Sequence, residues 1–233
     1  MIAEPRTLHG MKDAPLLRGN LAVRLVALFV GLILFGFAIT FMLESGLGLP
    51  PWDVLHSGIA QHTPMTLGTA GIVVGLVIIA ITWLAGTPPG FATIANAVVI
   101  GAVVNIFTAM AAFQHLSDSS LGLRIGLLVA GILLFGVGSA LYIGAGMGAG
   151  PRDSLMLTIS RRTGKRIAVV RGAMEGTVLV TGILLGGDVG IGTIALAVCV
   201  GPVVELSFWL LLELGVATPR ARTELEFGPL DAA

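Results

Sequence analysis

The feature that most limits what this chain can fold into is a stretch of 64 residues, 54–117, that contains no aspartate, glutamate, lysine or arginine. A water-soluble fold would have to place part of this stretch on its surface, and soluble domains contain about 25% charged residues. The whole chain is 55% hydrophobic and 11% charged, with a mean hydropathy of +0.98. The sequence therefore predicts an integral membrane protein.

Six apolar segments are long enough to cross a bilayer as helices, which takes about 20 residues. They lie at about 21–43, 66–86, 90–113, 121–145, 167–186 and 191–214. Two of the intervening stretches, 44–65 and 146–166, are longer than simple turns, and each contains a break rich in glycine and proline. We expect an all-α polytopic membrane protein with six transmembrane helices and a broken or partial helix in each of these two stretches.

The chain repeats itself with a period of 100 residues. Residues 21–110 align without a gap with residues 121–210, and about 25 of those 90 positions are identical. Shared hydrophobicity does not explain the matches that cluster around the two breaks, because they are glycines, prolines and aspartates. These matches pair Gly46, Gly48, Pro51, Asp53 and Leu55 with Gly146, Gly148, Pro151, Asp153 and Leu155.

The repeat predicts two halves of three helices each, at 21–113 and 121–214. Because three is an odd number, the second half must enter the membrane from the side opposite to the first, which gives the inverted repeat seen in many transporters. Lysine and arginine gather at the amino terminus, in 152–166 and in the tail, and such residues mark the cytoplasmic side. The segments 1–20 and 215–233 are therefore expected to be cytoplasmic.

Each partial helix is expected to begin at a proline that an aspartate follows two residues later, Asp53 in PPWD and Asp153 in GPRD. One interpretation is that both acids are only helix caps, which accept unpaired backbone amide protons. The other is that they line a solute pathway, because irregular backbone at membrane depth is tolerated only against protein or a water-filled cavity. Trp52 and Arg152, which precede the two acids, would then be further candidates for solute contact, with Arg152 as a candidate for contact with an anion.

Arg171 and Glu175 lie within the fifth span and are four residues apart, so they share one helix face. They are expected either to neutralise each other as a pair or to serve a pathway. In the second case Glu175 would titrate or bind a cation, and Arg171 would bind an anionic group. The first half has Gly71 and Gly75 at the matched positions, so such a site would be asymmetric.

Asn105 and Glu205 occupy matched positions in the third and sixth spans. They are expected either to face each other across the repeat axis or to act as interhelical hydrogen-bonding groups. The first alternative makes both residues candidates for solute contact or coupling.

The sequence contains no pattern that indicates catalysis or a cofactor. No histidine and cysteine cluster has the spacing of metal ligands, no Ser/His/Asp set suggests a hydrolase, and there is one cysteine. GAGMGAG follows a membrane helix rather than a strand, which argues against a dinucleotide fingerprint. The formal net charge of zero gives no reason to expect nucleic-acid binding. We expect neither an enzyme nor a bound cofactor or metal.

Several segments resemble the YczE-like membrane proteins of bacteria, a group often placed with the YitT-type proteins. These segments are GLGLPPWDVL, GPRDSLMLTISRRTGK, VVRGAMEG and LLGGDVGIGTIALAVCVGP, and the resemblance covers nearly all of 21–210. It implies a small multi-pass protein of the bacterial cytoplasmic (inner) membrane, of a kind often described as a transporter without an established substrate. The matching positions, to which it assigns no catalytic role, are Pro51, Trp52, Asp53, Pro151, Arg152, Asp153, Arg171 and Glu175.

The leading hypothesis is a secondary transporter or permease for a small solute that works by alternating access, with Asp53, Asp153 and Glu175 as candidates for proton coupling. The alternative is a non-transporting accessory protein that scaffolds a membrane biosynthetic or export assembly, and it predicts a dry interior. A substrate-binding subunit of an energy-coupled importer ranks lower, because such subunits are not clear inverted repeats. The expected partners are the solute and the lipid bilayer, and homo-oligomerisation is left open.

Overall fold

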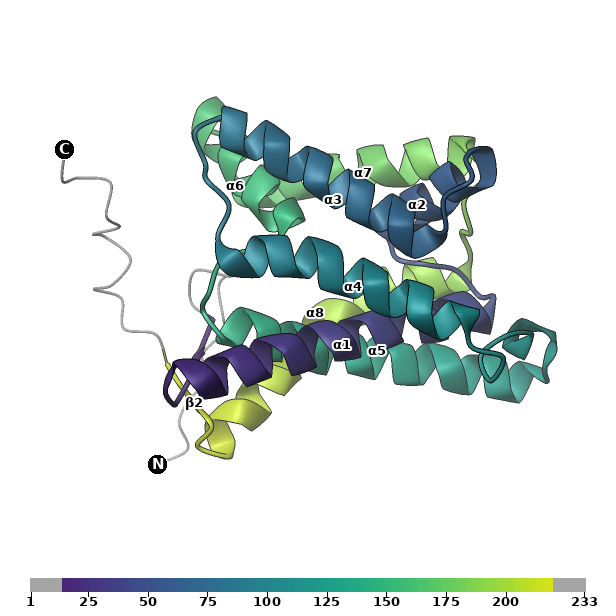
Figure 1. Ribbon diagram of the computed structural model, residues 1–233, viewed down its shortest axis with the longest axis horizontal. Helices are drawn as coiled ribbons and strands as arrows, with labels where there is room; N and C mark the ends of the chain where they lie inside the picture. Colours follow the sequence, from purple (N-terminus) through teal and green to yellow (C-terminus); the bar gives the residue numbers. More distant parts are fainter. Residues whose placement is uncertain (1–13, 220–233) are drawn as a thin grey trace.

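The structure is a computed structural model, and it describes residues 14–219 (Figure 1). Within that range lie six helices that are long and apolar enough to cross a membrane. They are α1 (Leu21–Ser45), α3 (Leu67–Leu84), α4 (Phe91–Ala109), α5 (Leu121–Gly144), α7 (Ile167–Leu184) and α8 (Ile191–Glu213). Two shorter helices, α2 (Pro51–His62) and α6 (Pro151–Thr163), fill the stretches in which partial helices were expected. The prediction of an all-α, multi-pass membrane protein is confirmed.

The long helices satisfy the backbone internally, as a bilayer requires of a spanning segment. Their outer faces carry large apolar side chains that no other part of the described chain covers, among them Trp83 on α3, Ile194 on α8 and Val180 on α7. In water such a surface would be unfavourable, whereas in a bilayer it contacts lipid tails. The core that holds the helices together is therefore narrow and lies mainly along α1 and α5.

The centre of the molecule is the antiparallel pair α1 and α5. Arg24, at the start of α1, donates to the carbonyl oxygen of Ala145 at 2.7 Å and to that of the next residue at 3.2 Å. Arg124, at the start of α5, donates in the same way to Ser45 at 2.7 Å and to the following residue at 3.0 Å. The last carbonyl groups of a helix lack intrahelical partners and attract cations, so each half stabilises a helix end of the other.

Between these ends the backbones of α1 and α5 touch. A Cβ atom at Gly31 would lie 2.8 Å from the carbonyl oxygen of Gly138, and one at Gly138 would lie 2.7 Å from that of Gly31. Small residues allow this approach between membrane helices. The reciprocal contacts support the predicted inverted repeat, whose orientation in the bilayer stays a prediction.

Arg124→Ala is expected to lower the free energy of unfolding by about 1–2 kcal/mol, because hydrogen bonds from a charged group contribute about 1.5–3 kcal/mol and this one is partly exposed. The control is Arg161→Ala, which removes an exposed arginine from α6 and is expected to change stability by less than about 0.5 kcal/mol. Unfolding of the purified protein in mixed detergent and SDS measures both. Equal effects of the two substitutions would contradict the role given to Arg124.

The helices form two layers (Figure 1). In one layer α1 packs against α4 and α5, and α5 packs against α8; the other layer contains α2, α3, α6 and α7. The short helices are exchanged between the halves, because α2 packs on α7 and α6 packs on α3. Ser57 on α2 donates to Asp188 beyond α7, and Thr158 on α6 contacts Thr87 beyond α3 at 3.0 Å. This exchange brings the starts of α2 and α6 together between the layers.

The two halves differ in how their second and third spans pack. α3 lies along α4 so closely that a Cβ atom at Gly101 on α4 would be 2.4 Å from the carbonyl oxygen of Gly68 on α3. The equivalent residue of the second half, Gly201 on α8, has no such neighbour within 4 Å. α7 therefore stands away from α8, whereas α3 is closed against α4.

The third spans pack on the first spans in the same way in both halves. A Cβ atom at Gly36 on α1 would lie 2.5 Å from Val103 Cγ1, and one at Gly136 on α5 would lie 2.4 Å from Val203 Cγ1. The packing of α4 on α1 is thus matched by the packing of α8 on α5. The short helices are not matched in this way, because α2 lies more extensively on α7 than α6 does on α3.

The two ends of the membrane-spanning region lie side by side. β1 (Leu16–Leu17) pairs with β2 (Ala217–Thr218) as a short antiparallel ladder, so the chain enters α1 and leaves α8 on the same side. A 3₁₀ helix, η2 (Leu116–Asp118), links α4 to α5. Much of the two expected cytoplasmic segments, residues 1–13 and 220–233, lies outside the described residues.

Candidate functional site

Asp53 and Asp153 lie in the first turns of α2 and α6 but do not cap them. The residues at the cap positions are Pro50 and Gly150, and neither helix has a side-chain cap hydrogen bond. The interpretation of the two acids as helix caps is therefore wrong. Proline at the first helical position needs no amide partner, so both carboxylates are left available for other contacts.

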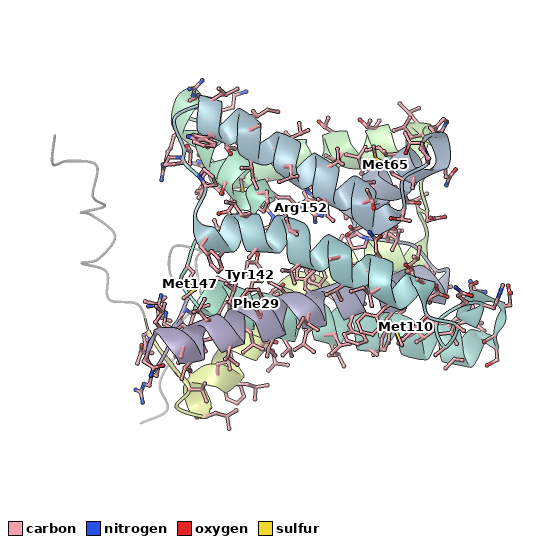
Figure 2. All side chains as sticks on the ribbon, in the orientation of Figure 1. Phe29, Met65, Met110, Tyr142, Met147 and Arg152 are labelled. Carbon is pink, nitrogen blue, oxygen red and sulfur yellow. The ribbon has the colours of Figure 1, made fainter. Side chains whose placement is uncertain are left out.

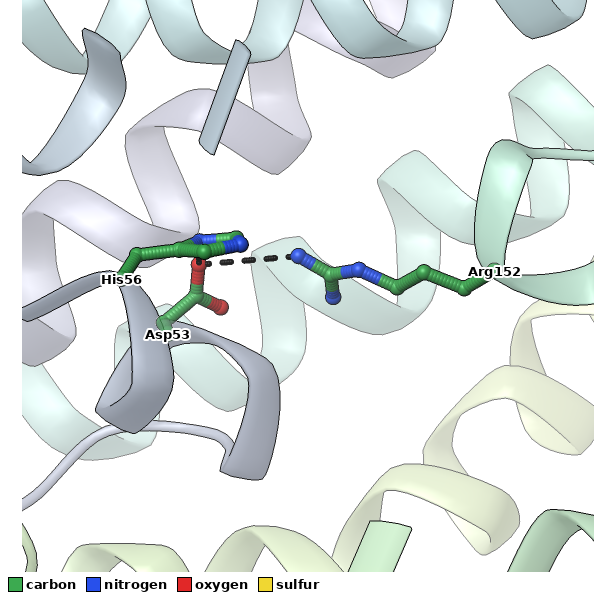
Figure 3. Close-up of polar contacts among 3 residues, drawn as sticks. All are labelled: Asp53, His56 and Arg152. Carbon is green, nitrogen blue, oxygen red and sulfur yellow. Dashed lines mark hydrogen bonds and ion pairs between the residues drawn. The ribbon is translucent and has the colours of Figure 1, made fainter. Parts of the chain in front are cut away.

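Asp53 is the centre of a polar cluster that joins the two halves (Figure 3). Its Oδ1 atom lies 3.0 Å from Nδ1 of His56, one turn further along α2, and 3.7 Å from the guanidinium group of Arg152 on α6. Asp53 is only 2% exposed, whereas the side chain of Arg152 is 32% exposed. A buried carboxylate needs a compensating positive charge, and here the other half of the chain supplies it.

Trp52 forms the second contact of Arg152. The guanidinium carbon lies 5.1 Å from the centroid of the indole ring, within the range of a cation–π interaction. Trp52 and Arg152 occupy matched positions of the repeat, so the arginine of one half covers the aromatic ring of the other. Trp52 and Asp53 thus form one cation-binding surface, which an arginine of the same chain now covers.

Two atoms of the cluster, Asp53 Oδ2 and His56 Nε2, have no hydrogen-bond partner among the described residues. When Nδ1 of His56 donates to Asp53, Nε2 of a neutral ring is an acceptor. Buried polar groups normally have partners, and the residues Asp53 and His56 line a cavity of about 70 Å³. The cluster can therefore bind a donor that enters this cavity.

A larger cavity of about 240 Å³ lies between the two layers, lined mainly by α5, α6, α7 and α8, and it includes the space where α7 and α8 stand apart. Its walls combine aromatic rings, carboxylates and guanidinium groups. The residues of these three kinds are Phe35, Trp52, Phe135, Tyr142, Asp153, Glu175, Arg152 and Arg171. The interior of the protein is thus partly polar and hollow, which weighs against the dry interior expected of a scaffold.

Arg152 belongs to the wall between the two cavities. Phe35, Tyr142, Arg152 and Asp153 border both of them, and Arg152 lies between the two helix layers in Figure 2. The hydroxyl oxygen of Tyr142 is 3.5 Å from Asp153 Oδ2. A change in the position of the Arg152 side chain would therefore affect both cavities.

Of the remaining predicted site residues, two lie at the cavities and two do not. Arg171 and Glu175 both line the larger cavity but form no ion pair with each other, so the predicted pairing is wrong. Asn105 contacts Thr66 and Thr69 at the start of α3, at 2.6 and 3.0 Å, and lines neither cavity. Glu205 is an exposed residue of α8 and likewise lines neither.

Two residues of the site carry more weight than the sequence suggested. His56 lies three residues after Asp53, a spacing that places both side chains on one helix face. Tyr142 was not singled out, although it is the one tyrosine in the chain and lies in an apolar span. A lone polar aromatic residue at membrane depth is a signal that could have found it.

The donor set of the site suits an organic or protonic ligand better than a metal. Among residues 14–219, no group of three or more histidine, cysteine, aspartate or glutamate side chains is arranged to hold a metal ion. The groups that converge on the two cavities are instead carboxylates, guanidinium groups, an imidazole and aromatic rings. Such groups bind charged or aromatic small molecules and exchange protons.

Comparison with known proteins gives a family and several relatives. Residues 22–208 match the "Family of unknown function (DUF6198)". An "Uncharacterized membrane protein YczE" of Bacillus subtilis is 34% identical over 82% of this chain and 88% of its own length. An "Uncharacterized protein" of Haemophilus influenzae is 35% identical over 80% and 84%, and "YyaS" of B. subtilis is 26% identical over 77% and 92%. No solved structure gives a significant match.

Proposed function

The chain belongs to the family of unknown function DUF6198, and we propose that it is a secondary transporter that moves a small solute across a bacterial cytoplasmic membrane by alternating access. The observation that carries this proposal is the difference between the matched helix pairs. α3 is closed against α4, while α7 stands away from α8 and leaves the larger cavity. In a transporter built from inverted repeats, exchanging these two arrangements between the halves exposes the site to the other side.

The larger cavity belongs to the side on which the chain termini lie. α8 ends just before β2, and a short connection joins α7 to α8, so the start of α7 lies on the same side as the end of α8. The cavity is lined by the early residues Arg171 and Glu175 of α7, by Tyr142 and Ile143 at the end of α5, and by Gly201 in the middle of α8. With cytoplasmic termini, the larger cavity lies on the inward side and the close contact between α3 and α4 lies on the outward side, as the proposal requires of an inward-facing state.

The polar cluster supplies the coupling element in this proposal. Arg152 lies between the two cavities and neutralises Asp53, so a solute that moves Arg152 also changes the charge balance around Asp53 and His56. An imidazole and a carboxylate in contact can take up or release a proton when that balance changes. Asp53 and His56 are therefore the residues that we propose for proton coupling.

Site-directed labelling tests the two states without knowledge of the solute. In a Cys199→Ala background, Met174→Cys places a thiol at the larger cavity and Val74→Cys places one at the matched position of the smaller cavity. Met174→Cys should react with a membrane-impermeant maleimide from the cytoplasmic side. Val74→Cys should react from the outside, and only in the opposite state.

The two labelling rates should be anticorrelated, because the proposal allows one cavity to open only when the other closes. Cross-linking α7 to α8 should therefore raise the rate at Val74→Cys. The alternative of a rigid accessory protein predicts that Val74→Cys stays protected under every condition. That result, with Met174→Cys labelled normally, would contradict alternating access.

A further inference from the structure

Acidic groups outnumber basic groups in the lining of the two cavities, which contains three carboxylates and two guanidinium groups: Asp53, Asp153, Glu175, Arg152 and Arg171. When all three carboxylates are ionised and His56 is neutral, the lining has one negative charge in excess inside a membrane protein, where unpaired charge is costly. One monovalent cation in the cavities would balance the set, whereas an anion would increase the imbalance.

Asp53 and Trp52 together have the composition of a site for an organic cation. Indole rings attract cations at their faces, and the carboxylate beside the ring keeps one oxygen atom, Oδ2, without a hydrogen-bond donor although the residue is 2% exposed. Arg152 meets the other oxygen at 3.7 Å, which is too long for a hydrogen bond. A ligand that brings both positive charge and N–H donors would satisfy this carboxylate better than Arg152 does.

We propose that the solute is a small monovalent organic cation with a guanidinium or ammonium group. It binds between Trp52 and Asp53, in the position that the Arg152 guanidinium now occupies. Arg152, which belongs to the same chain, then occupies the site when no solute is bound and competes with the solute for it. The inference deepens the proposed function, because it names the class of solute for the same site.

When the solute enters, the Arg152 side chain can move into the larger cavity. This side chain is partly exposed and borders both cavities, and the larger one also presents Asp153 and Glu175. Turning toward these carboxylates keeps the guanidinium paired. At about 240 Å³ the larger cavity has room for both the displaced guanidinium and an entering small cation, and its rings, Phe35, Phe135 and Tyr142, offer further faces to a cation.

Tryptophan fluorescence provides a direct test of binding. Of the three tryptophans, Trp83 and Trp209 are largely exposed on the apolar outer surface, so Trp83→Phe with Trp209→Phe leaves Trp52 as the single reporter. Titration of this protein in detergent with methylguanidinium or methylammonium should change the emission saturably. Methylurea, which has nearly the shape of methylguanidinium but no charge, and acetate, an anion of similar size, should not.

Substitutions of the site should change the affinity in opposite directions. Arg152→Gln should bind methylguanidinium about tenfold more tightly or better, because removing the competitor makes the site available in every molecule. Asp53→Asn should weaken binding by about tenfold or more through loss of the charge. The control Arg161→Gln, which alters an exposed arginine on the same helix, should stay within about threefold of the parent.

Several results would overturn the assignment. Weaker binding of methylguanidinium by Arg152→Gln would show that Arg152 attracts the ligand rather than competing with it. Saturable binding of acetate that Arg152→Gln abolishes would identify an anion site. Equal binding of methylurea would show that charge plays no part. Gel filtration and far-ultraviolet circular dichroism of the Arg152→Gln variant check that the variant is folded.

Uptake of radiolabelled methylguanidinium into proteoliposomes separates this inference from the proposed function. Binding with the predicted mutational pattern but without uptake would support the cation site and contradict transport. Uptake of an anion by a protein that does not bind methylguanidinium would support transport and contradict the cation assignment. Uptake of methylguanidinium that Asp53→Asn abolishes would support both.

Discussion

Replacing Gly101 with alanine is expected to lower the free energy of unfolding by roughly 2 kcal/mol, whereas the same replacement at Gly201 should change it by less than about 0.5 kcal/mol. The added methyl group at Gly101 would lie 2.4 Å from the carbonyl oxygen of Gly68, so α3 and α4 would have to move apart. At Gly201 it would meet no neighbour within 4 Å. Unfolding in mixed detergent and SDS measures both variants.

Transport should be sensitive to Gly201→Ala, although this substitution should hardly change stability. In the opposite state α7 is expected to close on α8 as α3 now closes on α4, so Gly201→Ala should obstruct that state although it is stable in this one. A clash of about 1–3 kcal/mol in one state corresponds to a loss of roughly 5- to 150-fold in its population. Normal solute uptake by Gly201→Ala would contradict a closed α7–α8 contact, and labelling at Val74→Cys in the same variant checks the population directly.

Arg152→Ala is expected to destabilise the protein by about 3 kcal/mol, because it leaves the buried carboxylate of Asp53 without its charge partner. This value is at the low end of the range for buried ion pairs, since the Arg152 side chain is 32% exposed. The double variant Asp53→Asn with Arg152→Ala should recover most of the loss. A double-mutant cycle on the free energy of unfolding isolates the coupling between the two residues.

The matched control for this cycle is Arg161→Ala, on the same helix and away from both cavities. It should cost less than about 0.5 kcal/mol, and combining it with Asp53→Asn should give the sum of the two single effects. If the coupling between Asp53 and Arg152 were no larger than this control, the contact at 3.7 Å would not stabilise the fold, and Arg152 would have to be assigned a different role.

The fold was predictable from the sequence because bilayer thickness sets the length of the spans. All six expected helices are present, and the largest error is at the third, expected to end at residue 113 but ending at Ala109. The partial helices also followed from local signals, since Pro51 and Pro151 mark their starts. Apolar spans and helix-breaking prolines are recognised from residues that are close together in the chain, so both can be found without the structure.

The site was only partly predictable, because its contacts join residues that are about 100 positions apart. The repeat indicated that Asp53 and Asp153 were special, but not that Arg152 of one half would pair with Asp53 of the other. That contact depends on the exchange of α2 and α6 between the halves. Asn105 forms the interhelical hydrogen bonds that were one of its two predicted roles. Neither Asn105 nor Glu205 lines a cavity, because equivalent residues of an imperfect repeat have different neighbours when α7 and α8 separate.

The reciprocal arginine contacts between α1 and α5 have a consequence for the origin of the chain. Arg24 satisfies the end of α5 and Arg124 satisfies the end of α1, so neither half can complete its own helix end. A protein made of one half would find the missing arginine only in a second copy inserted in the opposite direction. Duplication of one three-helix unit accounts for this interdependence, because each copy then supplies the arginine that the helix end of the other needs.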